Sequence, residues 1–272
     1  MAKLSGAQII VEALKAEGVK HVFGVSGSVT LPILDIIFSE PQIRYIQTQH
    51  EQNAMFMANG YARATRAAGI CLVSPGPGIT NCLSGTAQAF QSSTPNLLIG
   101  VEEGNKVHGL GSSCHHDVEA VMIFKPVTKL SLRVEHVGRL LGSLQMAFRT
   151  ALTGRKGPVY VGIAKDILMD EADVDILSPL KYRVEHLPPA DPLSVSKAVD
   201  LLIAAKSPVV LAGGGVAWAQ AQDALLALAE HLAMPVATTG HNKGLIPEDH
   251  PLALGTVSQH GTPPAMQTMR EA

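Results

Sequence analysis

Short aliphatic runs alternate with helical patterns along most of this chain, and this alternation constrains its fold more than any other feature. The runs typical of strands lie at 19–25, 43–47, 69–73, 97–101, 127–132 and 158–163. Strands that are apolar at nearly every position are buried on both faces, and helices between them allow neighbouring strands to run parallel. The pattern therefore predicts an α/β fold with a parallel sheet that has helices on both faces.

Composition narrows the class of protein further. The chain has 272 residues, of which 46% are hydrophobic but only 4% aromatic, so the core must be mainly Ala, Val, Ile and Leu. The formal net charge of −2 provides no strong field for nucleic acid. No run approaches the roughly 18 apolar residues of a membrane span. Cys71, Cys82 and Cys114 form no C-x-x-C pair, so no disulfide framework is indicated, and we expect a soluble cytoplasmic protein.

A change of character between residues 171 and 192 divides the chain into two parts. This stretch is acidic and proline-rich, and it includes Pro188-Pro189, which is typical of a linker. We predict a first domain at 1–170, a linker at 171–192 and a second domain at 193–272. In the second domain the pattern predicts helices at 193–205, 217–233 and 264–272, and two clear strands at 208–212 and 234–238. Because two strands are few, we expect an incomplete Rossmann-like α/β domain.

The segment 48–65 places a carboxylate on the inward face of a predicted helix. One helical stripe contains Glu51, Ala54, Ala58, Tyr61, Ala62 and Thr65. Thr48 and Glu51 also have the T-x-x-E spacing of a capping box, in which Glu51 would serve only to begin the helix. The pattern leaves both interpretations open.

A second segment, 73–81, joins an apolar strand to a helical pattern through two prolines and two glycines. Such a turn is rigid and poor in side chains, so a flat ligand can approach its backbone closely. A phosphate-binding loop is not supported, since no Gly-Lys-Ser/Thr follows. An ordinary strand-to-helix turn is the simpler alternative.

Taken together, these two segments resemble a known family. The motif H-E-Q-x-A at 50–54, continuing as M-A-x-G-Y-A-R at 57–63 and followed by P-G-P-G-x-T-N at 75–81, looks like the N-terminal, pyrimidine-binding domain of thiamine-diphosphate-dependent enzymes of the acetolactate synthase and 2-oxo-acid decarboxylase superfamily. Further stretches agree in the family's order, at 22–24, 31–35, 154–159, 165–166 and 208–215. The resemblance covers essentially the whole chain.

The resemblance implies roles for individual residues. In the family, a glutamate at the position of Glu51 hydrogen-bonds N1′ of the aminopyrimidine and so promotes removal of the thiazolium C2 proton. By motif matching, the cofactor would also contact Ser26, Gly27, Ser74, Pro77 and Asn81. The turn 25–28 departs from the Tyr-Pro-Gly-Gly of acetolactate synthases, which leaves the substrate open.

A larger departure lies at His115-His116-Asp117, where acetolactate synthases have Phe-Gln-Glu. Adjacent histidines resemble the pair that moves protons in pyruvate decarboxylases, because imidazole titrates near neutral pH. We therefore predict that His116, and with less support His115, contacts the substrate. A surface loop and a chance metal-like cluster with Cys114 are the alternatives.

For the whole protein, the resemblance implies decarboxylation or carboligation of a 2-oxo acid by a lyase or transferase that acts as a dimer or tetramer. Mg²⁺ would be bound with the diphosphate by a C-terminal domain whose Gly-Asp-Gly motif this sequence lacks, so no metal ligand is predicted here. Gly213-Gly214-Gly215 leaves FAD possible as a second cofactor. Two alternatives stay open: a simple decarboxylase that uses His115 and His116, and a fragment or split subunit that is inactive alone.

Overall fold

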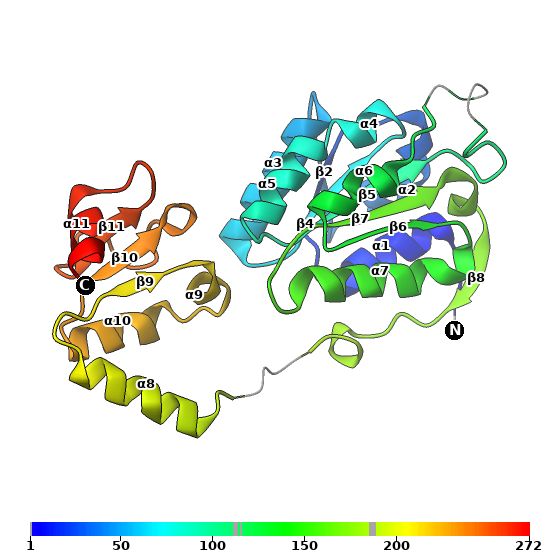
Figure 1. Cartoon of the computed structure of the whole chain (residues 1–272). Helices are drawn as coiled ribbons and strands as arrows, with labels where there is room; N and C mark the ends of the chain where they lie inside the picture. The colour runs from blue at the N-terminus through cyan, green and yellow to red at the C-terminus, as the bar shows by residue number, and fades with distance from the viewer. Residues whose placement is uncertain (1, 111–113, 115, 185–188) are drawn as a thin grey trace. The chain divides into compact units, whose positions relative to one another are not determined.

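The computed structural model describes residues 2–110, 114, 116–184 and 189–272, which form two compact units (Figure 1). The first unit is Met1–Glu185 and the second is His186–Ala272. Each is considered by itself below. Within the described ranges, no helix is long and apolar enough to cross a membrane.

A six-stranded parallel sheet forms the centre of the first unit and confirms the predicted α/β class. Its strand order is β3-β2-β4-β5-β7-β6, and every neighbouring pair is parallel. The strands are β2 (His21–Gly24), β3 (Arg44–Gln47), β4 (Gly69–Val73), β5 (Asn96–Glu102), β6 (Leu130–Val134) and β7 (Val159–Ala164). All residues of β4, β5 and β7 are buried, as their continuous apolar runs predict.

Helices cover both faces of this sheet (Figure 1). One face packs against α1 (Gly6–Ala16), α2 (Leu31–Ser39) and α7 (Val137–Leu152). The other packs against α3 (Glu51–Thr65), α4 (Pro77–Thr80), α5 (Leu83–Gln91) and α6 (Ala120–Phe124). Along β4 the side chains alternate accordingly: Ile70 and Leu72 belong to the first core, and Cys71 and Val73 to the second. Each fully buried aliphatic side chain contributes about 1.5–3 kcal/mol.

The first unit also contains a two-stranded antiparallel sheet, for which the sequence pattern gives no strand signal. It joins β1 (Ala2–Ser5) to β8 (Glu171–Val174). The stretch expected to be a linker, 171–192, therefore starts with a paired strand. Further along it, Tyr182 and Arg183 both hydrogen-bond to Glu17 at the end of α1. The chain up to Arg183 thus packs on the first unit.

The second unit contains a three-stranded parallel sheet of order β11-β10-β9. Its elements are α8 (Pro192–Ala204), β9 (Val210–Ala212), α9 (Gly214–Trp218), α10 (Gln222–His231), β10 (Val236–Thr239), β11 (Ala253–Val257) and α11 (Pro263–Glu271). The prediction of two strands was wrong, because β11 is only half-buried and has no apolar run. The single helix predicted at 217–233 is divided in two near Gln220, whose φ is 52°.

Candidate active site

The sheet of the first unit has a switch point between β2 and β4. From β2 the chain crosses to β3 on one side, whereas from β4 it continues to β5 on the other. Open parallel sheets bind ligands outside the carboxyl ends of their strands at such a point. The turns that follow β2 and β4 meet here so closely that a methyl group added to Gly27 would overlap with the Oγ of Ser74. The turn at 25–28 and the turn at 73–81 therefore lie together at the switch point.

Glu51 is the first residue of α3 and reaches the same place. The N-cap is His50, whose Nδ1 accepts a hydrogen bond from the Gln52 amide at 3.1 Å. Thr48 instead donates from Oγ1 to the carbonyl oxygens of Gly24 and His50, so the alternative of a capping box formed by Thr48 and Glu51 is wrong. The Glu51 carboxylate is thereby available, and its Oε2 accepts a 2.8 Å hydrogen bond from Asn81 Nδ2.

The turn after β4 forms a wall that carries few side chains. Gly76 has φ 61° and ψ −116°, a conformation that L residues rarely adopt. Pro77 is exposed and begins α4, where its missing N–H costs no hydrogen bond. A methyl group at Gly78 would lie 3.5 Å from Glu51 Oε1, so the glycine leaves the carboxylate uncovered. The predicted rigid turn therefore faces the predicted carboxylate.

Two buried hydroxyls at this site have no hydrogen-bond partner among the residues that the structure describes: Ser74 Oγ and Tyr45 Oη. Leaving a buried polar group unpaired costs about 1–3 kcal/mol, so such groups call for an explanation. Burial, with the nearby Cys71 thiol and Glu51 carboxylate, raises the pKa of Tyr45, which keeps its proton. A ligand with a polar edge would fit these groups.

Gln47, the last residue of β3, belongs to the site but was missed in the sequence. Its Oε1 accepts a 3.2 Å hydrogen bond from the Ser26 amide, and its Nε2 donates to the carbonyl oxygen of Thr48. Gln47 thus links the turn after β2 to the segment that leads to Glu51. Its position at the carboxyl end of a strand was the available signal, since such ends line the switch point.

The two predicted histidines differ in what the structure describes. His116 is exposed and approaches the site through its backbone: a methyl group at Gly76 would lie 2.9 Å from the His116 carbonyl oxygen. His115 lies outside the described residues.

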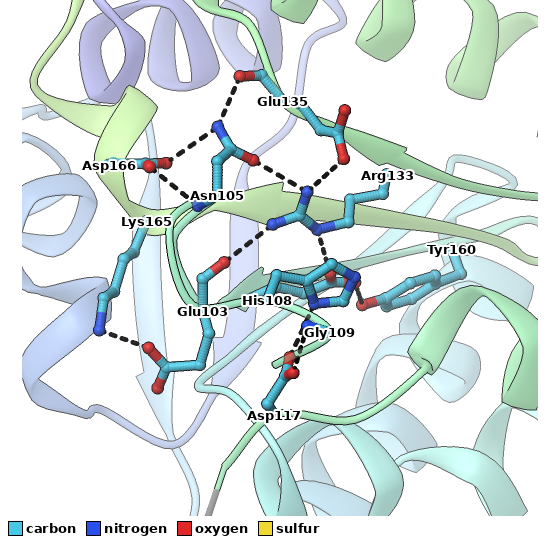
Figure 2. Close-up of polar contacts among 11 residues, drawn as sticks. Glu103, Asn105, His108, Gly109, Asp117, Arg133, Glu135, Tyr160, Lys165 and Asp166 are labelled. Atoms are coloured by element: carbon cyan, nitrogen blue, oxygen red, sulfur yellow. Dashed lines mark hydrogen bonds and ion pairs between the residues drawn. The ribbon is translucent and has the colours of Figure 1, made fainter. Parts of the chain in front are cut away.

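A polar cluster occupies the carboxyl ends of β5, β6 and β7 (Figure 2). At its centre Glu102 accepts hydrogen bonds from Tyr160 Oη at 2.5 Å and Arg133 Nε at 2.7 Å. Burial raises the pKa of Glu102, although both partners favour its charged form. Beside it, Glu103 pairs with Lys165. Burial opposes ionisation of Glu103 as well, but Lys165, Cys114 and His116 lower its pKa overall.

The described residues show no metal centre. Within the described ranges, no group of three or more His, Cys, Asp and Glu side chains could hold a metal ion. Gly213-Gly214-Gly215 follows β9 and enters α9, a helix of only 5 residues.

Comparison with known families gives two matches along the chain. Residues 4–121 match the family described as "Thiamine pyrophosphate enzyme, N-terminal TPP binding domain". Residues 195–272 match "Thiamine pyrophosphate enzyme, central domain". The first match contains the switch point and the residues around it.

Similar proteins include three whose names agree with one another. The probable acetolactate synthase large subunit of Methanocaldococcus jannaschii is 38% identical over 98% of this chain and 46% of its own length. The acetolactate synthase large subunit of Corynebacterium glutamicum is 35% identical over 99% of this chain and 43% of its own length. The acetolactate synthase isozyme 3 large subunit of Escherichia coli is 35% identical over 100% of this chain and 48% of its own length. The chain spans about half the length of these curated relatives.

Proposed function

Because the chain belongs to the thiamine pyrophosphate enzymes, with their N-terminal and central domains, we propose that its first unit binds the aminopyrimidine of thiamine diphosphate at the β2–β4 switch point. The names of its relatives support a reaction of the acetolactate synthase type. The whole protein would then decarboxylate a 2-oxo acid and join the remaining fragment to a second carbonyl.

The contact between Glu51 and Asn81 is the observation that carries this proposal. It joins the first residue of α3 to the residue after α4, so the carboxylate is held at the glycine turn by a charge-assisted hydrogen bond of 2.8 Å. The hydroxyls of Ser74 and Tyr45, which have no hydrogen-bond partner in the part of the chain that the structure describes, lie at the same switch point. Around them are Ser26, Gly27 and Pro77, the other residues that we propose to contact the cofactor.

Thiamine diphosphate, when bound, supplies a nucleophilic carbon that adds to the carbonyl of a 2-oxo acid and allows carbon dioxide to leave. The proposed role of Glu51 follows from the different surroundings of its two carboxylate oxygens. Asn81 fixes Oε2, while Oε1 faces the uncovered side of Gly78. We assign to Oε1 the exchange of a proton with the ring nitrogen of the aminopyrimidine. Acid–base catalysis of this kind contributes about 10²–10⁴-fold to a rate.

His116 is proposed to act on the substrate side. An imidazole can act as an acid or a base, unlike an amide, so this side chain is suited to deliver or remove a proton at the reacting carbonyl. Its backbone contact with Gly76 places it beside the cofactor turn. His115 is proposed to assist, on the sequence pattern alone.

The remaining parts of the assignment concern the whole protein. We propose that Mg²⁺ and the diphosphate are bound by a separate domain, that the assembled enzyme is a dimer or tetramer, and that FAD is an optional ligand of the second unit near Gly213. The free state of Cys71, Cys82 and Cys114 supports the expected cytoplasmic location.

The test is the substitution Glu51→Gln, which keeps the size of the side chain but removes its proton exchange. In the enzyme assembled with its diphosphate-binding domain, and with thiamine diphosphate and Mg²⁺, exchange of the thiazolium C2 proton in D₂O, followed by NMR, should slow by about 10²-fold or more. Glu12→Gln is the control, because Glu12 lies on α1 and pairs with Lys15. An exchange rate that Glu51→Gln leaves unchanged would remove Glu51 from this role.

The same measurement separates the complete catalyst from a split enzyme. It should be made with the chain alone and with a second chain that carries a diphosphate-binding domain. If the chain alone binds the cofactor and turns over pyruvate, the split interpretation is wrong. Activity that needs the second chain would make this protein the pyrimidine-binding subunit.

A further inference from the structure

The segment that contains His116 is held in place by hydrogen bonds of the following residue, Asp117. Asp117 Oδ1 lies 2.7 Å from His108 Nδ1, and Oδ2 accepts a 2.6 Å hydrogen bond from the Gly109 amide (Figure 2). The Asp117 side chain is only 9% exposed. Both carboxylate oxygens are therefore engaged by one short stretch of chain.

The charge state of Asp117 fixes the direction of these hydrogen bonds. Burial opposes its ionisation, but the Gly109 amide, His108 and the more distant Arg133 together lower the pKa of Asp117 below its ordinary value. The carboxylate is thus ionised at neutral pH and only accepts hydrogen bonds. His108 must then carry a proton on Nδ1 and donate it, which makes this a charge-assisted contact.

His108 belongs to the polar cluster at the carboxyl ends of the strands. It lies close enough to Glu102 to favour the ionised form of that carboxyl, which is itself held between Arg133 and Tyr160. Gly162 on β7 leaves the space for that carboxylate, since a methyl group there would overlap with Glu102 Oε1. The partner of Asp117 therefore lies beside the residues at the carboxyl ends of the strands (Figure 2).

On its other side the segment rests on the cofactor turn. A methyl group at Gly76 would lie 2.9 Å from the carbonyl oxygen and 3.0 Å from the Cα of His116. A contact this close leaves no free space between the two backbones. Displacement of Asp117 would consequently move the His116 backbone relative to Gly76.

We propose that Asp117 is a positioning residue for His116: by holding His108 and Gly109, it keeps the His116 backbone against Gly76, beside the switch point. The geometry of this anchor is independent of any cofactor, whereas its purpose rests on the function proposed above. Asp117 itself touches neither reacting atoms nor cofactor.

The experiment uses the full chain without cofactor, uniformly labelled with ¹⁵N, and the histidine signals are assigned by single substitutions. In Asp117→Asn, the imidazole signals of both His108 and His116 should shift, and the Gly109 amide should exchange with solvent about tenfold faster. Glu135→Gln is the matched control, because it removes one carboxylate of the same cluster that pairs with Arg133 and not with His108. It should leave the His116 signal in place.

A second pair of variants separates positioning from general loss of structure. His108→Ala removes the donor to Asp117 and should shift His116 as Asp117→Asn does. His108→Asn keeps an N–H near the position of Nδ1 and should restore the native His116 signal. A His116 signal that is unmoved in both Asp117→Asn and His108→Ala would overturn the proposal, as would one that moves equally in His108→Ala and His108→Asn.

Addition of thiamine diphosphate with Mg²⁺ distinguishes this proposal from the one it rests on. The His116 signal should respond to the cofactor in the native chain and respond less in Asp117→Asn. If the substitutions move His116 as described but no histidine responds to the cofactor, the anchor stands and the cofactor assignment fails. An equal response in the native chain and in Asp117→Asn would contradict the positioning role.

Discussion

Gly76 shows how one backbone conformation holds the site together. Its positive φ and its close approach to His116 both require the absence of a side chain. Gly76→Ala should lower the free energy of unfolding by about 1–3 kcal/mol, as is usual when an L residue is forced into such a conformation. The shift in urea midpoint at constant slope is the measurement.

Gly60 provides the control for that substitution. It lies exposed within α3, and a methyl group there would meet nothing within 4 Å. Gly60→Ala should therefore stabilise the helix by about 0.5–1 kcal/mol. Equal effects of the two substitutions would show that Gly76 is not under the constraint described.

Substitution of His116 should change the balance between carboligation and simple decarboxylation. His116→Gln removes an imidazole, which can act as an acid or a base, while keeping a hydrogen-bonding side chain. In the assembled enzyme with pyruvate, the ratio of carboligation product to aldehyde should change by about 10²-fold, the lower end of what a positioned acid or base contributes. His241→Gln, in the second unit, serves as a control. An unaltered ratio would count against contact with the substrate.

Sequence reasoning identified part of this site and missed another part for a physical reason. Glu51 and Asn81 are recognisable by family resemblance, and the structure places them in contact. Gln47 and Tyr45 lie on β3, a short strand with no distinctive motif. Their positions near Ser26 and Glu51 depend on the strand order, which the sequence pattern does not specify.

At the scale of elements, strands buried on both faces were the predictable ones. A continuous apolar run distinguishes β4 and β5, because helices cover each side of them. By contrast, β1 and β8 are short and pair with each other from opposite ends of the first unit, and β11 is only half-buried. Local pattern carries no information about such partners, so these strands became visible only in the fold.

The stretch after β8 is held against α1 by hydrogen bonds to Glu17, and this contact can be tested. Glu17 at the end of α1 has a side chain that is 1% exposed, and it accepts hydrogen bonds from Tyr182 Oη at 2.5 Å and from Arg183. Burial and Glu17 raise the pKa of Tyr182, so its hydroxyl stays protonated and donates. Glu17→Ala should release this stretch and speed tryptic cleavage after Lys181 and Arg183 about tenfold.

Mass spectrometry of the cleavage products gives these rates directly. Glu12→Ala is the matched control, since Glu12 lies on the same helix and pairs with Lys15 instead. If Glu12→Ala accelerates cleavage as much as Glu17→Ala does, the effect comes from α1 as a whole. The stretch up to Arg183 would then not be held by Glu17.

At the scale of the whole molecule, α8 is notable because it exposes large apolar side chains to water. None of its residues is buried, and three large side chains are among the most exposed in the described ranges: Leu193 at 72%, Leu201 at 74% and Ile203 at 69%. A helix that is apolar on most of its surface is ordinarily packed inside a larger assembly. We predict that this chain, when isolated, self-associates through α8.

The double substitution Leu201→Lys, Ile203→Lys tests this prediction without weakening the helix, because Lys and Leu have similar helix propensities. Burial of one leucine is worth about 1.5–3 kcal/mol, and 1.4 kcal/mol is tenfold in a dissociation constant. Sedimentation should therefore show association weakened by at least about tenfold. Leu180→Lys, which alters a lone leucine that is 65% exposed in the first unit, is the control. Association that survives the double substitution unchanged would place the contact on another surface.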